Sequence, residues 1–169
     1  MIHVCSLRLL EEEVARLGAS HVVTLINEDT MPTTPKVILP ENHLQLDMND
    51  INEPVDGLTP PDESHVDMLL TFVSSWGQDA PMVIHCWAGI SRSSAAGYVA
   101  LCLMNPDTDE HHIAASVRNA SHTATPNRRI VAIADRLLGR DGRMIAAIEK
   151  IGSGSMVSEG IPYSMPAKF

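Results

Sequence analysis

Nine residues from His85 to Ser93, reading HCWAGISRS, place a thiol, a guanidinium and a hydroxyl close together in the chain. Amide dipoles and nearby positive charge stabilise a thiolate, and such surroundings lower the pKa of a cysteine to roughly 3.5–7.5. The guanidinium of Arg92, six positions after Cys86, can hold two oxygens of a phosphate at once. The hydroxyl of Ser93 can donate to the sulfur of Cys86. These side chains point to nucleophilic chemistry at a phosphate-like centre.

The flanking residues predict a strand, a tight loop and a helix. The apolar run 81–84 precedes the motif and indicates a buried strand, and the run 94–104 indicates a buried helix. A helix N-terminus offers unpaired N–H groups and the positive end of the helix dipole. A loop wrapped around that end forms a nest of amides for an anion. Gly89 allows the backbone to turn tightly there.

The rest of the chain alternates strands with helices, which predicts an α/β fold with a central, mostly parallel sheet of about four to five strands flanked by helices. Further strands are expected at 1–6, 21–27 and 43–48. Further helices are expected at 7–17, 63–76, 109–120, 128–138 and 143–151. Residues 1–151 are predicted to form one domain, and the Gly-, Ser- and Pro-rich residues 152–169 an irregular tail.

Composition restricts the partners. The chain has 169 residues and a formal net charge of -9, which argues against nucleic acid and anionic membranes, since both attract basic surfaces. No apolar run is long enough to span a bilayer. The 3 cysteines have no paired spacing, which suits a reducing compartment, so a cytoplasmic location is expected. Oligomeric state does not follow from the sequence.

HCWAGISRS resembles the signature loop of the cysteine-dependent protein tyrosine phosphatase superfamily, of the dual-specificity-like subgroup. That signature reads His-Cys-x-x-Gly-x-x-Arg-Ser/Thr, and five residues match it: His85, Cys86, Gly89, Arg92 and Ser93. The helix, glycine and strand near the N-terminus also resemble the early part of these enzymes. The resemblance implies a phosphomonoester hydrolase that needs no metal or organic cofactor.

The resemblance also implies a role for each residue of the loop. Cys86 is the nucleophile that forms a phosphocysteine intermediate, Ser93 assists its breakdown, and His85 orients the loop. The phosphoryl group is bound by the Arg92 side chain and by the loop amides of Trp87, Ala88, Gly89, Ile90, Ser91 and Arg92. Asn127, in a Pro-Asn pair, corresponds to an asparagine that ties down the signature loop, and it is equally suited to cap the helix that follows.

A general acid must protonate the departing oxygen, and two aspartates fit this role. Asp50 directly follows the strand 43–48, where the family places its acid. Asp56 lies 30 positions before Cys86, in a stretch that resembles the acid loop of some members. Strand-end position favours Asp50, with Asp56 as the alternative and Asp47 as a third choice.

The expected substrate is a phosphorylated protein, or an aryl phosphate generally. None of the variable loop positions is basic, which disfavours phosphoinositides and favours phosphotyrosine, with phosphoserine or phosphothreonine as additional substrates. A phosphoprotein-binding pseudophosphatase with weak or no turnover is the alternative. A rhodanese-like sulfurtransferase is less consistent with the His-Cys start and the Arg-Ser end. Cys5 is expected in the core, although as a strand-end thiol it could also meet Cys86.

Overall fold

The computed structural model describes residues 1–169 and has five strands in one sheet. The strands are β1 (Ile2–Ser6), β2 (His21–Ile26), β3 (His43–Asp47), β4 (Met82–Cys86) and β5 (Tyr163–Met165). Their order across the sheet is β3-β2-β4-β1-β5. The first four are parallel, and β5 pairs antiparallel with β1. The predicted α/β fold with a mostly parallel sheet is therefore confirmed.

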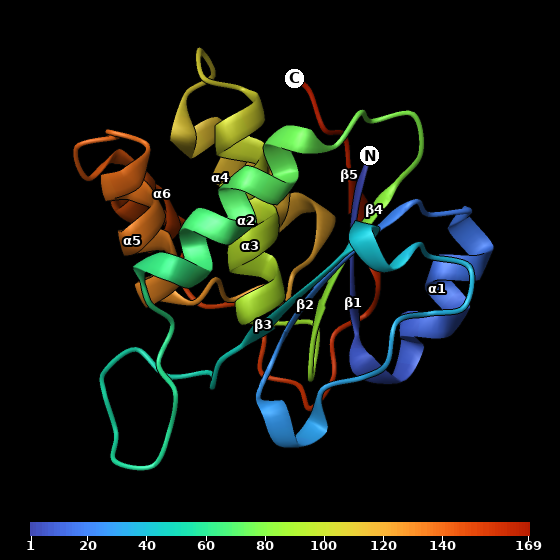
Figure 1. The fold of residues 1–169 in the computed structure, drawn as a ribbon. Coiled ribbons are helices and arrows are strands. Elements are labelled where there is room, and N and C mark those ends of the chain that lie inside the picture. The colour runs from blue at the N-terminus through green and yellow to red at the C-terminus, as the bar shows by residue number, and fades with distance from the viewer.

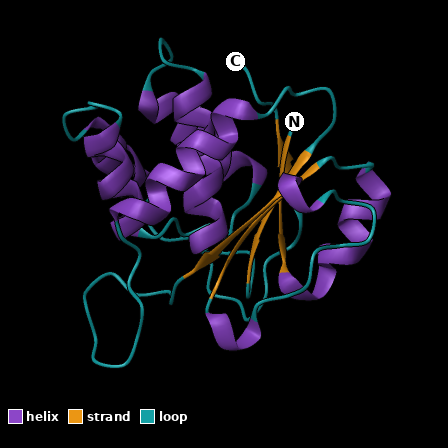
Figure 2. Cartoon of the chain, viewed as in Figure 1, coloured by secondary structure: helices purple, strands orange, loops and turns teal.

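Helices cover both faces of this sheet, as Figures 1 and 2 show. One face carries α1 (Leu10–Leu17), which follows a short 3-10 helix at Leu7–Leu9. The other face carries α2 (Glu63–Ser75), α3 (Arg92–Met104), α4 (Glu110–Ala120), α5 (Arg128–Leu137) and α6 (Arg143–Ile151). The larger apolar core lies on the second face, whereas α1 covers a small cluster of 7 buried residues. None of these helices combines the length and hydropathy needed to cross a lipid bilayer.

Helix α3 occupies the centre of the molecule and carries the signature loop at its N-terminus. Nearly all of its residues are buried, because it packs on the sheet and against α2, α4 and α5. This explains why its sequence is apolar all around instead of along one stripe. Gly97 fits between the helix and the sheet, where an added Cβ would lie 3.4 Å from Val4. The N-terminus of α3 is thus held rigidly under the loop.

The expectation of an irregular tail is wrong for its last part. Residues Tyr163–Met165 form the edge strand β5, with Tyr163 and Met165 buried and Ser164 exposed. The preceding residues 152–162, which we call the strap, have no regular structure but run along the carboxyl ends of the strands. Gly160 donates its backbone N–H to the carbonyl of Ala88 at 2.9 Å. The sequence pattern missed β5 because a three-residue strand among glycines and prolines has almost no periodicity.

A long loop, residues 48–62, connects β3 to α2. Its residues 52–59 are exposed and project from the body of the molecule (Figure 1). The loop ends at Asp62, which caps α2 by accepting a hydrogen bond from the backbone of His65 at 3.0 Å. This cap fixes the point at which the loop ends and α2 begins.

Candidate active site

The signature loop spans the end of β4 and the start of α3, as the sequence predicts. Cys86 is the last residue of β4 and is buried. Gly89 has φ +73°, and a Cβ at this position would lie 2.8 Å from the carbonyl carbon of Cys5. The positive φ and the close approach both require glycine. The loop is thereby pressed against the end of β1.

Cys86 and Ser93 contact each other inside the loop. The Sγ atom of Cys86 lies 3.1 Å from Oγ of Ser93, and both side chains are buried. A hydroxyl at this distance can donate to a thiolate and stabilise it. Ser93 also lies in the first turn of α3, where the unpaired N–H groups and the helix dipole favour negative charge.

Arg92 is the first residue of α3 and is buried with part of its hydrogen-bonding capacity unused. Its Nη1 donates to the backbone carbonyl of Met48 at 2.7 Å, which joins the guanidinium to the end of β3. Its Nε has no hydrogen-bond partner. A buried donor without a partner is costly, so a guanidinium at a helix N-terminus with a free N–H is well suited to receive an anion.

The structure brings Asp50 to the signature loop and leaves Asp56 away from it. Oδ1 of Asp50 accepts hydrogen bonds from the hydroxyl of Ser91 at 2.7 Å and from Nδ2 of Asn127 at 2.9 Å. Asp56 is exposed on the projecting part of the loop. Asp47 is engaged elsewhere, where it accepts from the backbone of Glu28 at 2.7 Å. Of the three aspartates, Asp50 is the one in contact with the loop.

Asn127 has both contacts that the sequence suggests. Its Oδ1 accepts from the backbone N–H groups of Arg129 and Ile130, each at 3.1 Å, and so caps α5. Its own backbone N–H donates to the carbonyl of Ser91 at 3.3 Å, and its side-chain amide donates to Asp50. One residue thus links α5, the signature loop and the loop after β3.

His85 directly precedes Cys86, and its side chain lies on the α1 face of the sheet. The side chain is fully buried, and burial lowers the pKa of His85 to about 4, so the ring is neutral near pH 7. Its Nε2 lies 2.6 Å from the hydroxyl of Thr24 on β2. Thr24 is in turn 2.7 Å from Nε2 of His43 on β3. The sequence analysis did not single out Thr24 or His43. The signal that could have found them is a polar residue within a strand that is otherwise mostly apolar.

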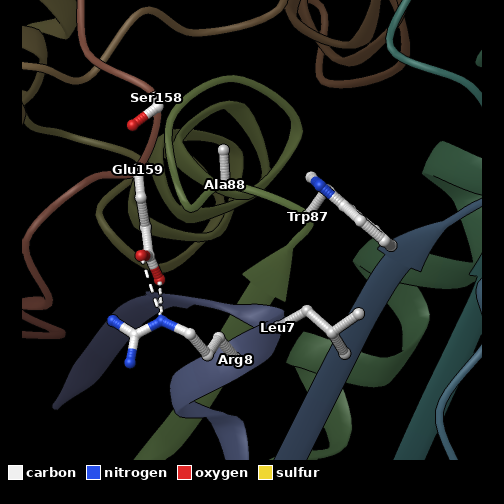
Figure 3. Close-up of a pocket in the computed structure, with 6 residues that line it drawn as sticks. All are labelled: Leu7, Arg8, Trp87, Ala88, Ser158 and Glu159. Carbon is white, nitrogen blue, oxygen red and sulfur yellow. Dashed lines mark hydrogen bonds and ion pairs between the residues drawn. The ribbon is translucent and has the colours of Figure 1, made fainter.

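A groove lies beside the signature loop, shown in Figure 3. Its volume is about 450 Å³. It is lined by two residues of the 3-10 helix, two of the loop and two of the strap: Leu7, Arg8, Trp87, Ala88, Ser158 and Glu159. Trp87 lies at the rim of this groove and is 56 % exposed. Glu159 accepts from Nε of Arg8 at 3.1 Å and from the hydroxyl of Ser6, which holds the strap in place.

The other thiols lie apart from Cys86. Cys5 pairs in register with His85 and belongs to the cluster under α1, whereas the neighbouring position Cys86 faces the opposite side of the sheet. Burial raises the pKa of both Cys5 and Cys102 to about 12. The core position of Cys5 is therefore confirmed. No group of three or more His, Cys, Asp or Glu side chains is arranged to hold a metal ion.

No family model and no curated protein matches this sequence. Solved structures do match. DUSP15 is 13% identical with a TM-score of 0.63 over 89% of each chain, and human DUSP28 is 19% identical with a TM-score of 0.61 over 82% of this chain and 88% of that one. The human tyrosine phosphatase-like serine/threonine/tyrosine-interacting protein is 18% identical with a TM-score of 0.59, over 81% and 87%.

These similarities define the class of fold. The chain has the fold shared by these dual-specificity and tyrosine phosphatase-like structures, which is the fold that the signature predicts. Among the particular proteins that it resembles, DUSP15 and DUSP28 are dual-specificity phosphatases, whereas the third is described as phosphatase-like. The activity of this chain must therefore be argued from its own residues.

Proposed function

We propose that this chain is a phosphomonoester hydrolase that acts on phosphotyrosine-type protein substrates through a phosphocysteine intermediate. The observation that carries this proposal is the joint placement of Cys86 against Ser93 and of Arg92, with an unpaired buried Nε, at the same helix N-terminus. A binding module needs the guanidinium and the amides but not a thiol supported by a hydroxyl.

In the first step, the thiolate of Cys86 attacks phosphorus in line with the departing oxygen. The P–S bond forms, the P–O bond to the substrate breaks, and Asp50 gives a proton to the leaving oxygen. The guanidinium of Arg92 and the amides of residues 87–92 hold the equatorial oxygens of the phosphoryl group, whose charge is stabilised more strongly in the transition state.

In the second step, water replaces the thiolate. The carboxylate of Asp50 takes a proton from water as the oxygen attacks phosphorus, the P–S bond breaks, and inorganic phosphate is released. The hydroxyl of Ser93 donates to the departing sulfur from a position 3.1 Å away. This step regenerates the thiolate and the protonated acid, so protons and electrons balance over the cycle.

Asp50 is proposed as the acid in place of Asp56. Its carboxylate is positioned by Ser91, a residue of the signature loop itself, at 2.7 Å. Asp56 would have to move from an exposed, projecting segment to reach the same centre. Positioning of this kind makes a large contribution to catalysis, which favours the residue that is already held in place.

The proposed substrate is an aryl phosphate ester on a protein. The loop side chains beside the phosphate nest, those of Trp87, Ala88 and Ile90, are apolar and uncharged. An exposed indole at the rim of the nest can contact an aromatic ring. A polyanionic headgroup would meet no basic side chain among these residues. No metal or cofactor is required by this mechanism.

The test is hydrolysis of a small aryl phosphate against pH, without added metal, by wild type, Cys86→Ser, Asp50→Asn and Asp56→Asn. We expect Cys86→Ser to be inactive and Asp50→Asn to lose roughly 100-fold or more in kcat, whereas Asp56→Asn stays near wild type. Absence of wild-type turnover together with tight binding of tungstate would reject the hydrolase in favour of a phosphoprotein-binding pseudophosphatase.

A further inference from the structure

Three hydrogen bonds, two of them buried and one partly buried, run in series across the sheet behind His85. We name the residues that they join, Thr34, His43, Thr24 and His85, the histidine relay. Nδ1 of His43 lies 2.9 Å from Oγ1 of Thr34, Nε2 of His43 lies 2.7 Å from Oγ1 of Thr24, and that same oxygen lies 2.6 Å from Nε2 of His85. Thr24 and His85 are fully buried and His43 is 9 % exposed, so water does not replace the two contacts of Thr24.

The fold places the relay on the α1 face of the sheet. Thr24 is directly opposite His85 in the parallel register of β2 and β4. His43 on β3 is opposite Val22, two residues from Thr24, so its side chain emerges on the same face. The relay therefore runs from the edge strand β3 to the residue that precedes the nucleophile.

A hydroxyl has one proton, and this restricts the relay to two arrangements. Thr24 must donate to one imidazole and accept from the other, and each neutral imidazole has one N–H. In the first arrangement His85 donates from Nε2, Thr24 donates to His43, and His43 donates to Thr34. In the second every bond is reversed, so Thr24 donates to Nε2 of His85 and the ring proton of His85 is on Nδ1.

The surroundings of His85 favour the second arrangement. Nδ1 of His85 is buried and has no hydrogen-bond partner in either arrangement, so the choice between them depends on the groups that surround the ring. The backbone of Cys86 acts on the ring in the sense that raises the pKa of His85, as a nearby acceptor does, and this favours a proton on the ring nitrogen beside it. Burial lowers the pKa of both His43 and His85 to about 4, so both rings are neutral near pH 7.

We infer that Thr24 and His43 are positioning residues of the site, which keep the proton of His85 on Nδ1, beside the backbone of Cys86. The positive end of an N–H dipole on that side favours a thiolate on the adjacent residue, whereas a lone pair there opposes it. This inference rests on the proposed role of Cys86 as a nucleophile. It extends the site by two strands, from the end of β4 to β3.

The other charged or titratable groups around His85 do not supply this control. Cys5 faces the ring from β1, and Arg92 acts on it from α3 as a positive charge. Helix α1 contributes apolar side chains to the cluster that covers this face, and its buried Glu13 is paired with His3 of β1 at 2.8 Å. Only His43 is connected to His85 by hydrogen bonds, through Thr24.

The direct test is the tautomer of His85 in the full-length wild-type chain. Nitrogen-15 chemical shifts of histidine-labelled protein near pH 7 distinguish a protonated ring nitrogen from a bare one, and the His85 signals are assigned by their absence in His85→Gln. We expect Nδ1 protonated and Nε2 bare in His85, with the opposite pattern in His43. A proton on Nε2 of His85 would overturn the inference, and no substitution within the relay is needed to observe it.

The second test follows the nucleophile. The rate at which iodoacetamide alkylates Cys86 is measured against pH, with the modified site confirmed by mass spectrometry. Cys5 and Cys102 react slowly because their pKa values are raised to about 12, so that few of their thiols ionise. We expect Thr24→Val and His43→Phe each to move the midpoint of this profile to higher pH by about one unit. Thr24→Ser, which keeps the hydroxyl, should leave the midpoint in place.

Two controls separate positioning from simple destabilisation. Val22→Ala loosens the same face of β2 without touching the relay, and we expect an unchanged midpoint. The double variant Thr24→Val/His43→Phe should shift no further than either single variant, because both break one series of bonds. An unshifted midpoint in folded Thr24→Val, or an equal shift in Val22→Ala, would overturn the inference. Neither test requires turnover, so their failure is distinguishable from failure of the proposed hydrolase.

Discussion

The side-chain amide of Asn127 donates to Oδ1 of Asp50 at 2.9 Å, which joins two residues 77 positions apart in the sequence. This contact connects the helix cap of α5 to the loop after β3, and Ser91 of the signature loop donates to the same oxygen. The proposed acid is therefore held from two sides. Its position depends on α5 as much as on the strand that precedes it.

Asn127→Ser tests that dependence. Serine caps helices about as well as asparagine, so α5 is expected to keep its stability, but the shorter side chain does not reach Asp50. We expect kcat on an aryl phosphate to fall roughly 10-fold as the acid loses its orientation. Steady-state kinetics and thermal denaturation measure the two effects separately. A loss of activity in Asn127→Ser that is accompanied by unfolding would reject this explanation.

Ser93→Ala tests the second chemical step. Loss of the hydroxyl 3.1 Å from the sulfur removes a donor to the departing thiolate, so breakdown of the intermediate should slow by roughly 100-fold while its formation is less affected. Rapid-quench experiments should then show a burst of released aryl alcohol and a trapped phosphocysteine. Ser93→Thr, which keeps a hydroxyl, is the matched control. A uniform slowing without a burst contradicts the assigned role.

Gly89→Ala tests the close packing of the signature loop against the end of β1. The new Cβ would lie 2.8 Å from the carbonyl carbon of Cys5, and φ is +73°. We expect a loss of roughly 1–3 kcal/mol in the free energy of unfolding and much weaker binding of tungstate. Gly139→Ala is the control, since its φ is +62° but nothing lies within 4 Å of the added atom. Equal losses in the two variants would show that the close approach to β1 has no effect.

Stability should fall on acidification through the range from 6.5 to 4. Burial lowers the pKa of His43 and of His85 to about 4, against 6.5 for an exposed histidine. Within this window the unfolded chain binds more protons than the folded one, so the free energy of unfolding rises with pH and is lost as pH falls. Each histidine contributes a slope of roughly 1.4 kcal/mol per pH unit.

Urea denaturation at several pH values measures this slope. His43→Gln removes one of the two most strongly shifted groups and should flatten the dependence by less than half relative to wild type, because the pKa values of His3 and His21 are lowered as well. Substitution of the exposed His122 is the control and should leave the slope unchanged. A wild-type stability that is constant between pH 6.5 and 4 would contradict the buried, neutral state of both rings.

Much of this architecture could be predicted from the sequence because its elements are signalled locally. The apolar run before Cys86, the glycine after α1 and Asp62 at the start of α2 each act through neighbouring residues, and the structure has strands and helices where they indicate. The signature loop is likewise contiguous. Sequence reasoning could therefore bring Cys86, Arg92 and Ser93 together.

The rest depends on contacts between distant segments. Spacing along the chain could not choose between Asp50 and Asp56, because the loop after β3 is long and only its first residues return to Ser91 and Asn127. Thr24 and His43 acquire their partners from the parallel register, which no single strand specifies. The position of the strap depends on its contacts with β1 and the signature loop, which its own sequence does not specify.

The pairing of β5 with β1 also orders the events of biosynthesis. Strand β1 has β4 on one side, but its other edge is covered only once Tyr163–Met165 of β5 have been synthesised. Until then a nascent chain exposes a bare strand edge, to which other chains can pair. The hydrogen bond from Gly160 to Ala88 of the signature loop can also form only at this stage. The sheet edge at β1 and the backbone contact to the signature loop are thus completed together, after β1 to β4 have been made.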